Sequence, residues 1–258
     1  MRPILEVRDL NRHFGGIQAI RGLNLSVLQG EILGVIGPNG AGKTTLFNVI
    51  TGFLRPSSGT ILFCDRDITG LKPHEVVRLG ISRTFQLSIL FAELSVLENV
   101  FTGFHLAYKT SIWTRLLRAR PALAEENKLR DKAEEIIEFT GLQSFRDELA
   151  GNLPHGFQRI LGVSIALATS PRLMLLDEPL TGMNAEEVDR MLDLIRRIRE
   201  SGVTVVLVEH NMKAVMDLCE RIVVLNYGVK IAEGPPDEIR DNPSVIEAYL
   251  GKDESAPA

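Results

Sequence analysis

One glycine-rich segment has the residue types and spacing of a phosphate-binding loop. It follows an apolar run at residues 32–36 and precedes a helix-like run at residues 46–50, so the sequence predicts a strand, a loop and a helix. In that setting backbone N–H groups surround phosphate oxygens, Lys43 reaches the β- and γ-phosphates, and the Thr44 hydroxyl binds Mg²⁺. The segment reads Gly37, Pro38, Asn39, Gly40, Ala41, Gly42, Lys43, Thr44, Thr45 and matches G-x-x-x-x-G-K-[ST] at every fixed position. We therefore expect a site for a nucleoside triphosphate such as ATP.

Two adjacent carboxylates follow a second apolar run. Residues 173–176 read Leu-Met-Leu-Leu and lead directly into Asp177 and Glu178. In open α/β sheets ligands bind at the carboxyl ends of strands. Asp177 is thus a candidate ligand for Mg²⁺ opposite Thr44, and Glu178 is a candidate to orient or deprotonate the attacking water. The alternative is an acid pair that caps a turn between a strand and a helix.

A histidine follows a third apolar run. Residues 203–208 read Val-Thr-Val-Val-Leu-Val, and Glu209 and His210 come next. A neutral imidazole at the end of a strand can donate to a γ-phosphate oxygen or orient the attacking water. The alternative is a structural histidine with no part in the chemistry.

The elements around these residues predict an α/β core. Short apolar runs at residues 173–176, 203–208 and 222–225 are typical of parallel strands covered on both faces. A run with helical spacing of its apolar residues, 185–199, lies between two of them and predicts a doubly wound arrangement. Near the start, residues 23–27 alternate apolar and polar types, which indicates an antiparallel strand.

The block from residue 87 to 157 has a different pattern. Residues 126–140 form an amphipathic helical pattern, and Gly141 stands where a helix ends. No strand is expected in this block, so we predict a mostly helical insertion. After Gly228 we expect a strand and turn up to Pro236, then a short helix and an irregular end over residues 252–258.

Composition limits the classes of function. The 29 basic and 33 acidic residues give a net charge of −4, which argues against a dedicated nucleic-acid binder. Two distant cysteines, Cys64 and Cys219, and a start without a signal sequence predict a cytosolic chain. No apolar run approaches the ~18–20 residues of a membrane span. Any link to a membrane is therefore expected to depend on a partner protein.

Taken in order, these motifs resemble the ATP-binding subunit of ABC transporters. The resemblance covers residues 5–251 and depends on residues 37–45, Gln86, 153–157, 173–179 and His210. It implies a P-loop NTPase core with a RecA-like parallel sheet and an N-terminal antiparallel β-subdomain over residues 1–86 and 158–235. It also implies an inserted helical subdomain over residues 87–157, and a C-terminal helix with a flexible tail over residues 236–258.

The resemblance also implies roles for single residues. Phe14 would lie under the adenine ring, and Gln86 would sense Mg²⁺ and the γ-phosphate while facing the permease. Asn184 would cross a dimer interface. Glu178 becomes the catalytic carboxylate and His210 the switch histidine. The plain alternatives are a core residue for Phe14, a surface residue for Gln86 and a helix cap for Asn184.

One motif departs from the family. The usual Leu-Ser-Gly-Gly-Gln is replaced by Leu153, Pro154, His155, Gly156 and Phe157. The serine hydroxyl is missing, and proline has no N–H group to replace it. Gly156, and a helix expected to start near Gln158, remain to contact the nucleotide on the opposite subunit. The loss of one hydrogen bond to a charged group costs about 1.5–3 kcal/mol, so we expect the partner's site to be the weaker one.

The branch of the family is indicated by three further segments. Residues 90–100, 231–239 and 242–251 resemble the ATPase of importers of branched-chain (hydrophobic) amino acids. ATPases of urea or amide importers and of lipopolysaccharide exporters look similar, and a regulatory ATP-binding subunit with low turnover also stays open. The separation between Gln86 and Gly156 leaves no room for the long coiled coil of a DNA-repair ATPase.

The mechanism implied is a sandwich of two ATPase cores around two Mg-ATP molecules, which closes on ATP and drives a permease. The implied partners are transmembrane permease subunits and a second ATPase, either a paralogue or a second copy. A solute-binding protein would take part indirectly in an importer. The chain would then lie on the cytoplasmic side of the inner membrane.

Overall fold

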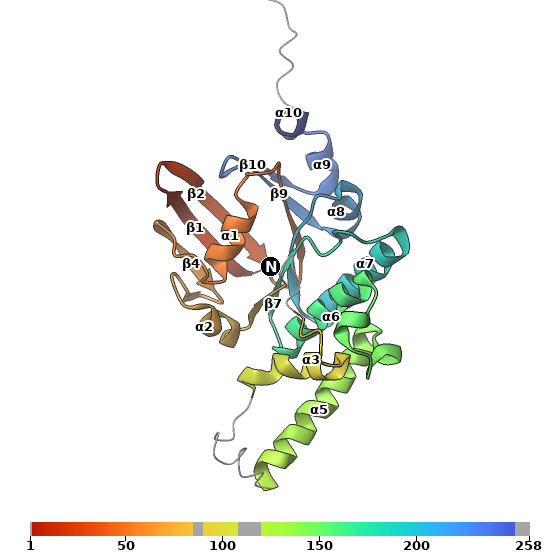
Figure 1. Ribbon diagram of the computed structural model, residues 1–258. Coiled ribbons are helices and arrows are strands. Elements are labelled where there is room, and N and C mark those ends of the chain that lie inside the picture. Colours follow the sequence, from red (N-terminus) through yellow and green to blue (C-terminus); the bar gives the residue numbers. More distant parts are fainter. Residues whose placement is uncertain (1, 85–89, 108–119, 251–258) are drawn as a thin grey trace, which may run out of the picture.

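Two β-sheets and two groups of helices build the chain (Figure 1). The computed structural model describes residues 2–84, 90–107 and 120–250. Gln86 and the tail 252–258 lie outside the described residues. The smaller sheet has the strand order β2-β1-β4-β5, and the larger sheet has the order β10-β9-β3-β8-β7-β6.

The larger sheet is the parallel core that the apolar runs predict. Its neighbours β9, β3, β8, β7 and β6 run parallel, and β10 pairs antiparallel with β9 at one edge. Every residue of β3, β7 and β8 is buried, which is why these strands read as continuous apolar runs. The strands are β3 (Ile32–Ile36), β6 (Ile81–Arg83), β7 (Leu173–Asp177), β8 (Thr204–Val208), β9 (Arg221–Asn226) and β10 (Val229–Gly234).

The smaller sheet is antiparallel and consists of β1 (Pro3–Phe14), β2 (Ile17–Leu28), β4 (Ser58–Phe63) and β5 (Arg66–Asp67). Helix α1 (Lys43–Ile50) packs between the two sheets, with Phe47 in one core with Leu5 and Val206. Helix α2 (Pro73–Arg78) leads into β6. The predicted fold class, an α/β core with an antiparallel β-subdomain, is confirmed.

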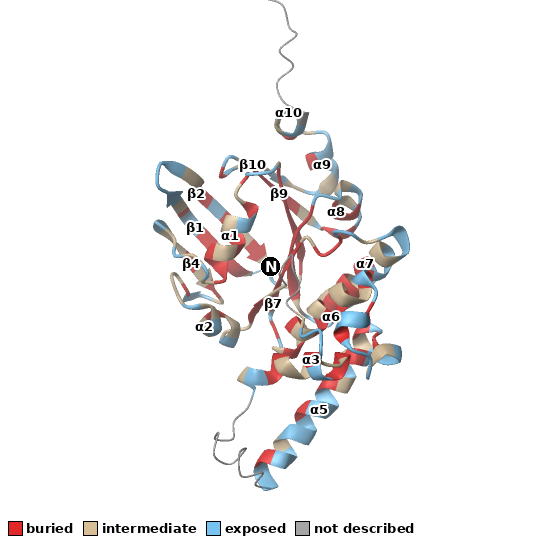
Figure 2. Ribbon diagram, in the orientation of Figure 1, coloured by how far each residue is buried: buried red, intermediate tan, exposed pale blue. Residues whose placement is uncertain are grey.

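The opposite face of the large sheet is covered by helices (Figure 2). In β7, Met174 and Leu176 face this helical layer, whereas Leu173 and Leu175 face α1 and the small sheet. The alternation follows from the two-residue period of a strand, so one strand contributes to both cores. From residue 155 onward the helices are α6 (His155–Ala168), α7 (Ala185–Glu200), α8 (Met212–Leu218), α9 (Pro236–Arg240) and α10 (Pro243–Leu250).

The insertion before α6 is helical, and its described residues contain no strand. Among the described residues helix α5 spans Arg120–Thr140, so it includes residues before the expected start at Glu126, where two alanines favour a helix. It ends at Thr140, and Gly141 adopts φ 77° as expected of a helix stop. The other elements are α3 (Val96–Thr102) and the 3₁₀ turns η1 (Gly103–Leu106), η2 (Gln143–Phe145) and η3 (Ala150–Asn152).

Helix α6 begins at His155, three positions before the expected Gln158. Pro154 is its N-cap, with φ −54° and an extended ψ of 148°. Proline fits this place because the first backbone N–H groups of a helix have no partner within the helix. The division of the chain at 86/87 and 157/158 stays a prediction, and α6 runs across the second of these boundaries.

Candidate functional site

Three strands of the large sheet end at the same edge with the residues singled out by chemistry. β3 leads into Gly37, β7 ends at Asp177, and β8 leads into Glu209 and His210. β8 lies between β3 and β7, and all three run parallel. The fold therefore brings the phosphate-binding loop, the acid pair and the histidine together, as the sequence predicts.

The phosphate-binding loop is held between β9 and the start of β2. Gly37 has φ 150°, and a Cβ there would lie 2.1 Å from the Leu225 carbonyl oxygen. Gly42 has φ 103°, and a Cβ there would lie 2.5 Å from the carbonyl oxygen of Ala19. Gly42 also starts α1 without a side-chain cap. The helix dipole and the first-turn N–H groups thus favour an anion at this end.

Lys43 lies within this loop rather than on its surface. Its side chain is buried, and Nζ donates to the carbonyl oxygens of Gly37 at 2.6 Å and Pro38 at 3.1 Å. Burial lowers the pKa of Lys43, and the nearby Glu178 and Asp177 carboxylates oppose that shift. Thr44 is exposed in the next position. The donor set fits a triphosphate: a cation, an uncapped helix end and a hydroxyl group converge on one loop.

Glu178 and His210 are in direct contact. Nε2 of His210 lies 3.0 Å from Oε1 of Glu178, and the Thr181 hydroxyl donates to Oε2 at 3.3 Å. Glu178 has φ 49°, in the left-handed region that residues other than glycine rarely adopt. Such a conformation costs of order 1–3 kcal/mol and persists only where the surroundings hold it. The two residues predicted for water activation thus form one unit at the strand ends.

Asp177 has a partner that the sequence analysis did not anticipate. The Arg83 guanidinium, at the end of β6, donates from Nη2 to Oδ2 of Asp177 at 2.7 Å. Arg83 is a basic residue at the end of β6, and the neighbouring strand β7 ends in the acid pair. A basic residue at such a strand end is the signal that could have identified this contact. Neighbouring parallel strands bring such residues together at one edge of the sheet.

Glu209 was also missed as a functional residue. Its carboxylate is buried and accepts the backbone N–H groups of Leu180 at 2.8 Å, His210 at 3.0 Å and Asn211 at 3.4 Å. Burial raises the pKa of Glu209, and these hydrogen bonds oppose that shift. The residue ties the loop after β7 to the loop after β8. It therefore links the loop that carries Glu178 to the loop that carries His210.

Phe14 is a surface residue at the tip of the first hairpin. It is 40% exposed, which excludes the alternative of a core residue. It pairs with Ile17, two positions before the Ala19 carbonyl that contacts the phosphate-binding loop. The Arg12 guanidinium carbon lies 4.5 Å from the centre of its ring. An exposed ring on the hairpin that contacts this loop is available to stack on a base.

Asn184 is the N-cap of α7, as the structural alternative predicts. Its side chain accepts the Glu187 N–H at 3.0 Å, and the Glu187 carboxylate accepts the Asn184 N–H at 3.0 Å. Gly156 is buried against the same carboxylate, where a Cβ would lie 2.5 Å from Oε1 of Glu187. A Cβ on Gly182 would lie 2.9 Å from the His155 ring. The unusual motif at residues 153–157 thus packs on the loop after β7 of its own chain.

Comparison with known proteins agrees with this site. A family model described as ABC transporter matches residues 20–181, and one described as branched-chain amino acid ATP-binding cassette transporter matches residues 229–255. The high-affinity branched-chain amino acid transport ATP-binding protein BraF of Pseudomonas aeruginosa is 42% identical, with 97% of this chain and 99% of that protein covered. The corresponding protein LivG of Escherichia coli is 40% identical, with the same coverage.

Solved structures give the same assignment. A crystal structure of an ATP-binding cassette of an ABC transporter in its ADP conformation has a TM-score of 0.86 at 32% identity, with 98% of this chain and 100% of that chain covered. A nucleotide-free ATP-binding cassette has a TM-score of 0.85 at 32% identity, with 97% and 100% covered. The chain therefore belongs to the ATP-binding cassettes of ABC transporters, and it is an ATPase. Among the helices that the structure describes, none has both the length and the apolar character to cross a membrane.

The cap on α7 gives a test of the loop after β7. Asn184→Ala removes the acceptor for the Glu187 N–H and is expected to lower the free energy of unfolding by ~1 kcal/mol. Asn184→Ser keeps a capping oxygen and is expected to stay within a few tenths of wild type. Urea unfolding measures both variants. A serine variant as unstable as the alanine variant would contradict the capping role.

Proposed function

We propose that this chain powers an importer of branched-chain or other hydrophobic amino acids. One observation carries the proposal: relatives named for branched-chain amino acid transport match the chain over nearly its whole length at 40–42% identity. A second match, over residues 229–255, falls on β10, α9 and α10, where the sequence already resembles this branch. The relatives described above are named for amino acid transport, so they favour this function over a lipopolysaccharide exporter and over a urea or amide importer.

We propose the following roles in the site. Phe14 stacks on adenine, residues 37–44 bind the phosphates, and Lys43 neutralises the β- and γ-phosphates. Glu178 orients or deprotonates the attacking water, and His210 holds that carboxylate and contacts the γ-phosphate. The intact contact between Glu178 and His210 supports hydrolysis over a regulatory subunit with low turnover.

Mg²⁺ would be held by Thr44 and Asp177, together with Gln86, which lies outside the described residues. Within the described part of the chain, no three His, Cys, Asp or Glu side chains gather as a metal site. Phosphate oxygens and water would complete the coordination of the ion, as is usual for Mg²⁺ bound with a nucleotide. The bound ion would neutralise charge on the β- and γ-phosphates.

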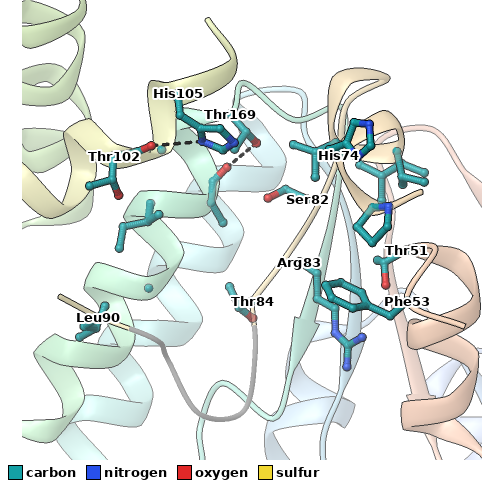
Figure 3. A pocket seen from close by; sticks show the side chains of 18 of the residues that line it. Thr51, Phe53, His74, Ser82, Arg83, Thr84, Leu90, Thr102, His105 and Thr169 are labelled. Carbon is teal, nitrogen blue, oxygen red and sulfur yellow. Dashed lines mark hydrogen bonds between the residues drawn. The ribbon is translucent and has the colours of Figure 1, made fainter. Parts of the chain in front are cut away.

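The partners proposed are transmembrane permease subunits, a second ATPase and, indirectly, a solute-binding protein. The chain would lie on the cytoplasmic side of the membrane. A pocket of about 650 Å³ supports docking of a permease segment (Figure 3). Phe53 and His74 line it from the core side, and His105 and Thr169 line it from the helical side. Phe53 and Phe91 in its lining are 54% and 53% exposed.

The solute is tested by uptake into vesicles that contain the chain assembled with its permease and supplied with a solute-binding protein. We expect ATP-dependent uptake of leucine, isoleucine or valine, and we expect Glu178→Gln to abolish it because the attacking water is no longer activated. Urea and short amides serve as control solutes. Uptake of these controls without uptake of the amino acids would contradict the proposal.

Pro154 replaces the serine of the usual motif. If the second ATPase is a paralogue with the usual motif, we therefore expect the two nucleotide sites to hydrolyse ATP at unequal rates. Glu178→Gln disables the site that faces the intact motif, so it is expected to remove most of the turnover. The matching change in the paralogue disables the site that faces Pro154 and is expected to cost less. Steady-state ATPase rates of the two assembled variants give the comparison, and equal losses would count against the asymmetry.

If a permease segment docks in this pocket, substitutions in the pocket lining should weaken assembly with the permease and leave nucleotide binding intact. Buried aromatic anchors often contribute 2 kcal/mol or more to an interface, so Phe53→Ala combined with Phe91→Ala is expected to weaken permease binding by about tenfold or more. ATP affinity of the isolated chain should stay unchanged. Leu123→Ala is the control, since Leu123 is 44% exposed on α5 and is not part of the pocket lining. Full permease binding by the double variant would refute docking at this pocket.

A further inference from the structure

Arg83 bridges two parts of the nucleotide site. It ends β6, the edge strand of the large sheet, and its side chain and that of Asp177 are only 5% and 6% exposed. Nη2 donates to Oδ2 of Asp177 at 2.7 Å, and Nη1 donates to Oδ1 of Asn48 at 2.6 Å. The guanidinium carbon lies 5.5 Å from the centre of the Phe47 ring. Asn48 and Phe47 belong to α1, the helix that begins at Lys43.

The backbone at the end of β6 supports this arrangement. Arg83 lies beside Leu175 in the parallel register, and the Thr84 N–H donates to the Leu175 carbonyl oxygen at 3.0 Å. The Asp177 N–H in turn donates to the Thr84 hydroxyl at 3.4 Å. The strand end therefore presents the guanidinium group to Asp177 in a fixed place. In Figure 3 the group lies at the end of β6 and points away from His74.

We propose that Arg83 is a positioning residue for ATP hydrolysis: it fixes the Asp177 carboxylate and ties it to the helix of the phosphate-binding loop. A positive charge beside Asp177 cannot serve to attract a cation, since it repels one. Arg83 supplies the counter-charge of a buried carboxylate, and we assign its benefit for catalysis to the geometry it imposes. A planar guanidinium group can hold two acceptors in fixed directions, whereas an ammonium group is a point charge on a flexible stem. The proposal depends on the ATPase activity and is independent of the transported solute.

The same residue also connects the site to the proposed docking pocket. Arg83 and Thr84 both line that pocket, and both bond to Asp177. A displacement of the strand end by a docked permease segment would therefore reach the carboxylate directly.

The test compares Arg83→Met and Arg83→Lys in the full chain, alone and assembled with its permease. kcat, the KM for Mg-ATP, the ATP affinity without Mg²⁺ and the unfolding midpoint are measured for each variant. Loss of position in an active site can cost about 100-fold in rate, so we expect Arg83→Met to lower kcat by ~100-fold and Arg83→Lys to recover about a tenth of the wild-type kcat. ATP affinity without Mg²⁺ is expected to stay within about twofold, since Lys43 and its loop are untouched.

Two comparisons separate positioning from folding. Arg172→Met is the control, because the Arg172 guanidinium packs over Phe63 at 5.9 Å, next to the opposite end of β7. Asn48→Ala removes the acceptor on α1 and is expected to give an intermediate kcat. Arg83→Met leaves a buried carboxylate without its counter-charge, so Arg83→Lys carries the test where the methionine variant does not fold. A lysine variant with wild-type kcat, or one whose kcat and Mg²⁺-free ATP affinity fall together, would overturn the proposal.

Discussion

The close approach of the phosphate-binding loop to β9 and β2 is the constraint on which the site depends. At Gly37 and Gly42 any side chain would meet a backbone oxygen at 2.1 and 2.5 Å. The loop can therefore turn tightly at the end of β3 and start α1 with an uncapped N-terminus. It also places Lys43 inside the loop, where its ammonium group is held by two carbonyl oxygens. A triphosphate can replace these neutral acceptors with charged ones, which are stronger partners.

The chemistry on the other strands is positioned by buried carboxylates rather than by the loops alone. Glu209 accepts three backbone N–H groups from two loops, and Arg83 holds Asp177 against α1. These contacts supply the surroundings that keep Glu178 in its left-handed conformation beside His210. Without these contacts the loop after β7 would relax, and Glu178 would adopt an ordinary negative φ. The histidine and the carboxylate would then separate.

The sequence predicted the elements whose pattern is local and missed the contacts that depend on the sheet. Continuous apolar runs identified β7 and β8 because both faces of these strands are buried. The start of α6 was expected at Gln158, since the rule that proline suits an N-terminal position was not applied to Pro154. The contacts of Arg83 with Asp177 and of Glu209 with Leu180 could not be assigned from spacing, because each joins residues that are far apart in the sequence. The sequence left two interpretations of Asn184 open, a residue at a dimer interface and a helix cap, and the side-chain geometry confirmed the cap.

The motif at residues 153–157 is packed against its own subunit at both unchanged and altered positions. Gly156 is required by contact with the Glu187 carboxylate, and His155 packs against Gly182. The N-terminus of α6, the cap of α7 and the loop after β7 thus form one packed unit. A change in the position of Glu178 would be felt by the motif at residues 153–157, because the loop after β7 carries Glu178 and contacts His155 through Gly182. If this motif faces the partner's nucleotide as we propose, the missing serine hydroxyl would remove one hydrogen bond there, while the packing of the motif on the loop after β7 stays in place. That connection is the physical basis for expecting unequal turnover rather than inactivity.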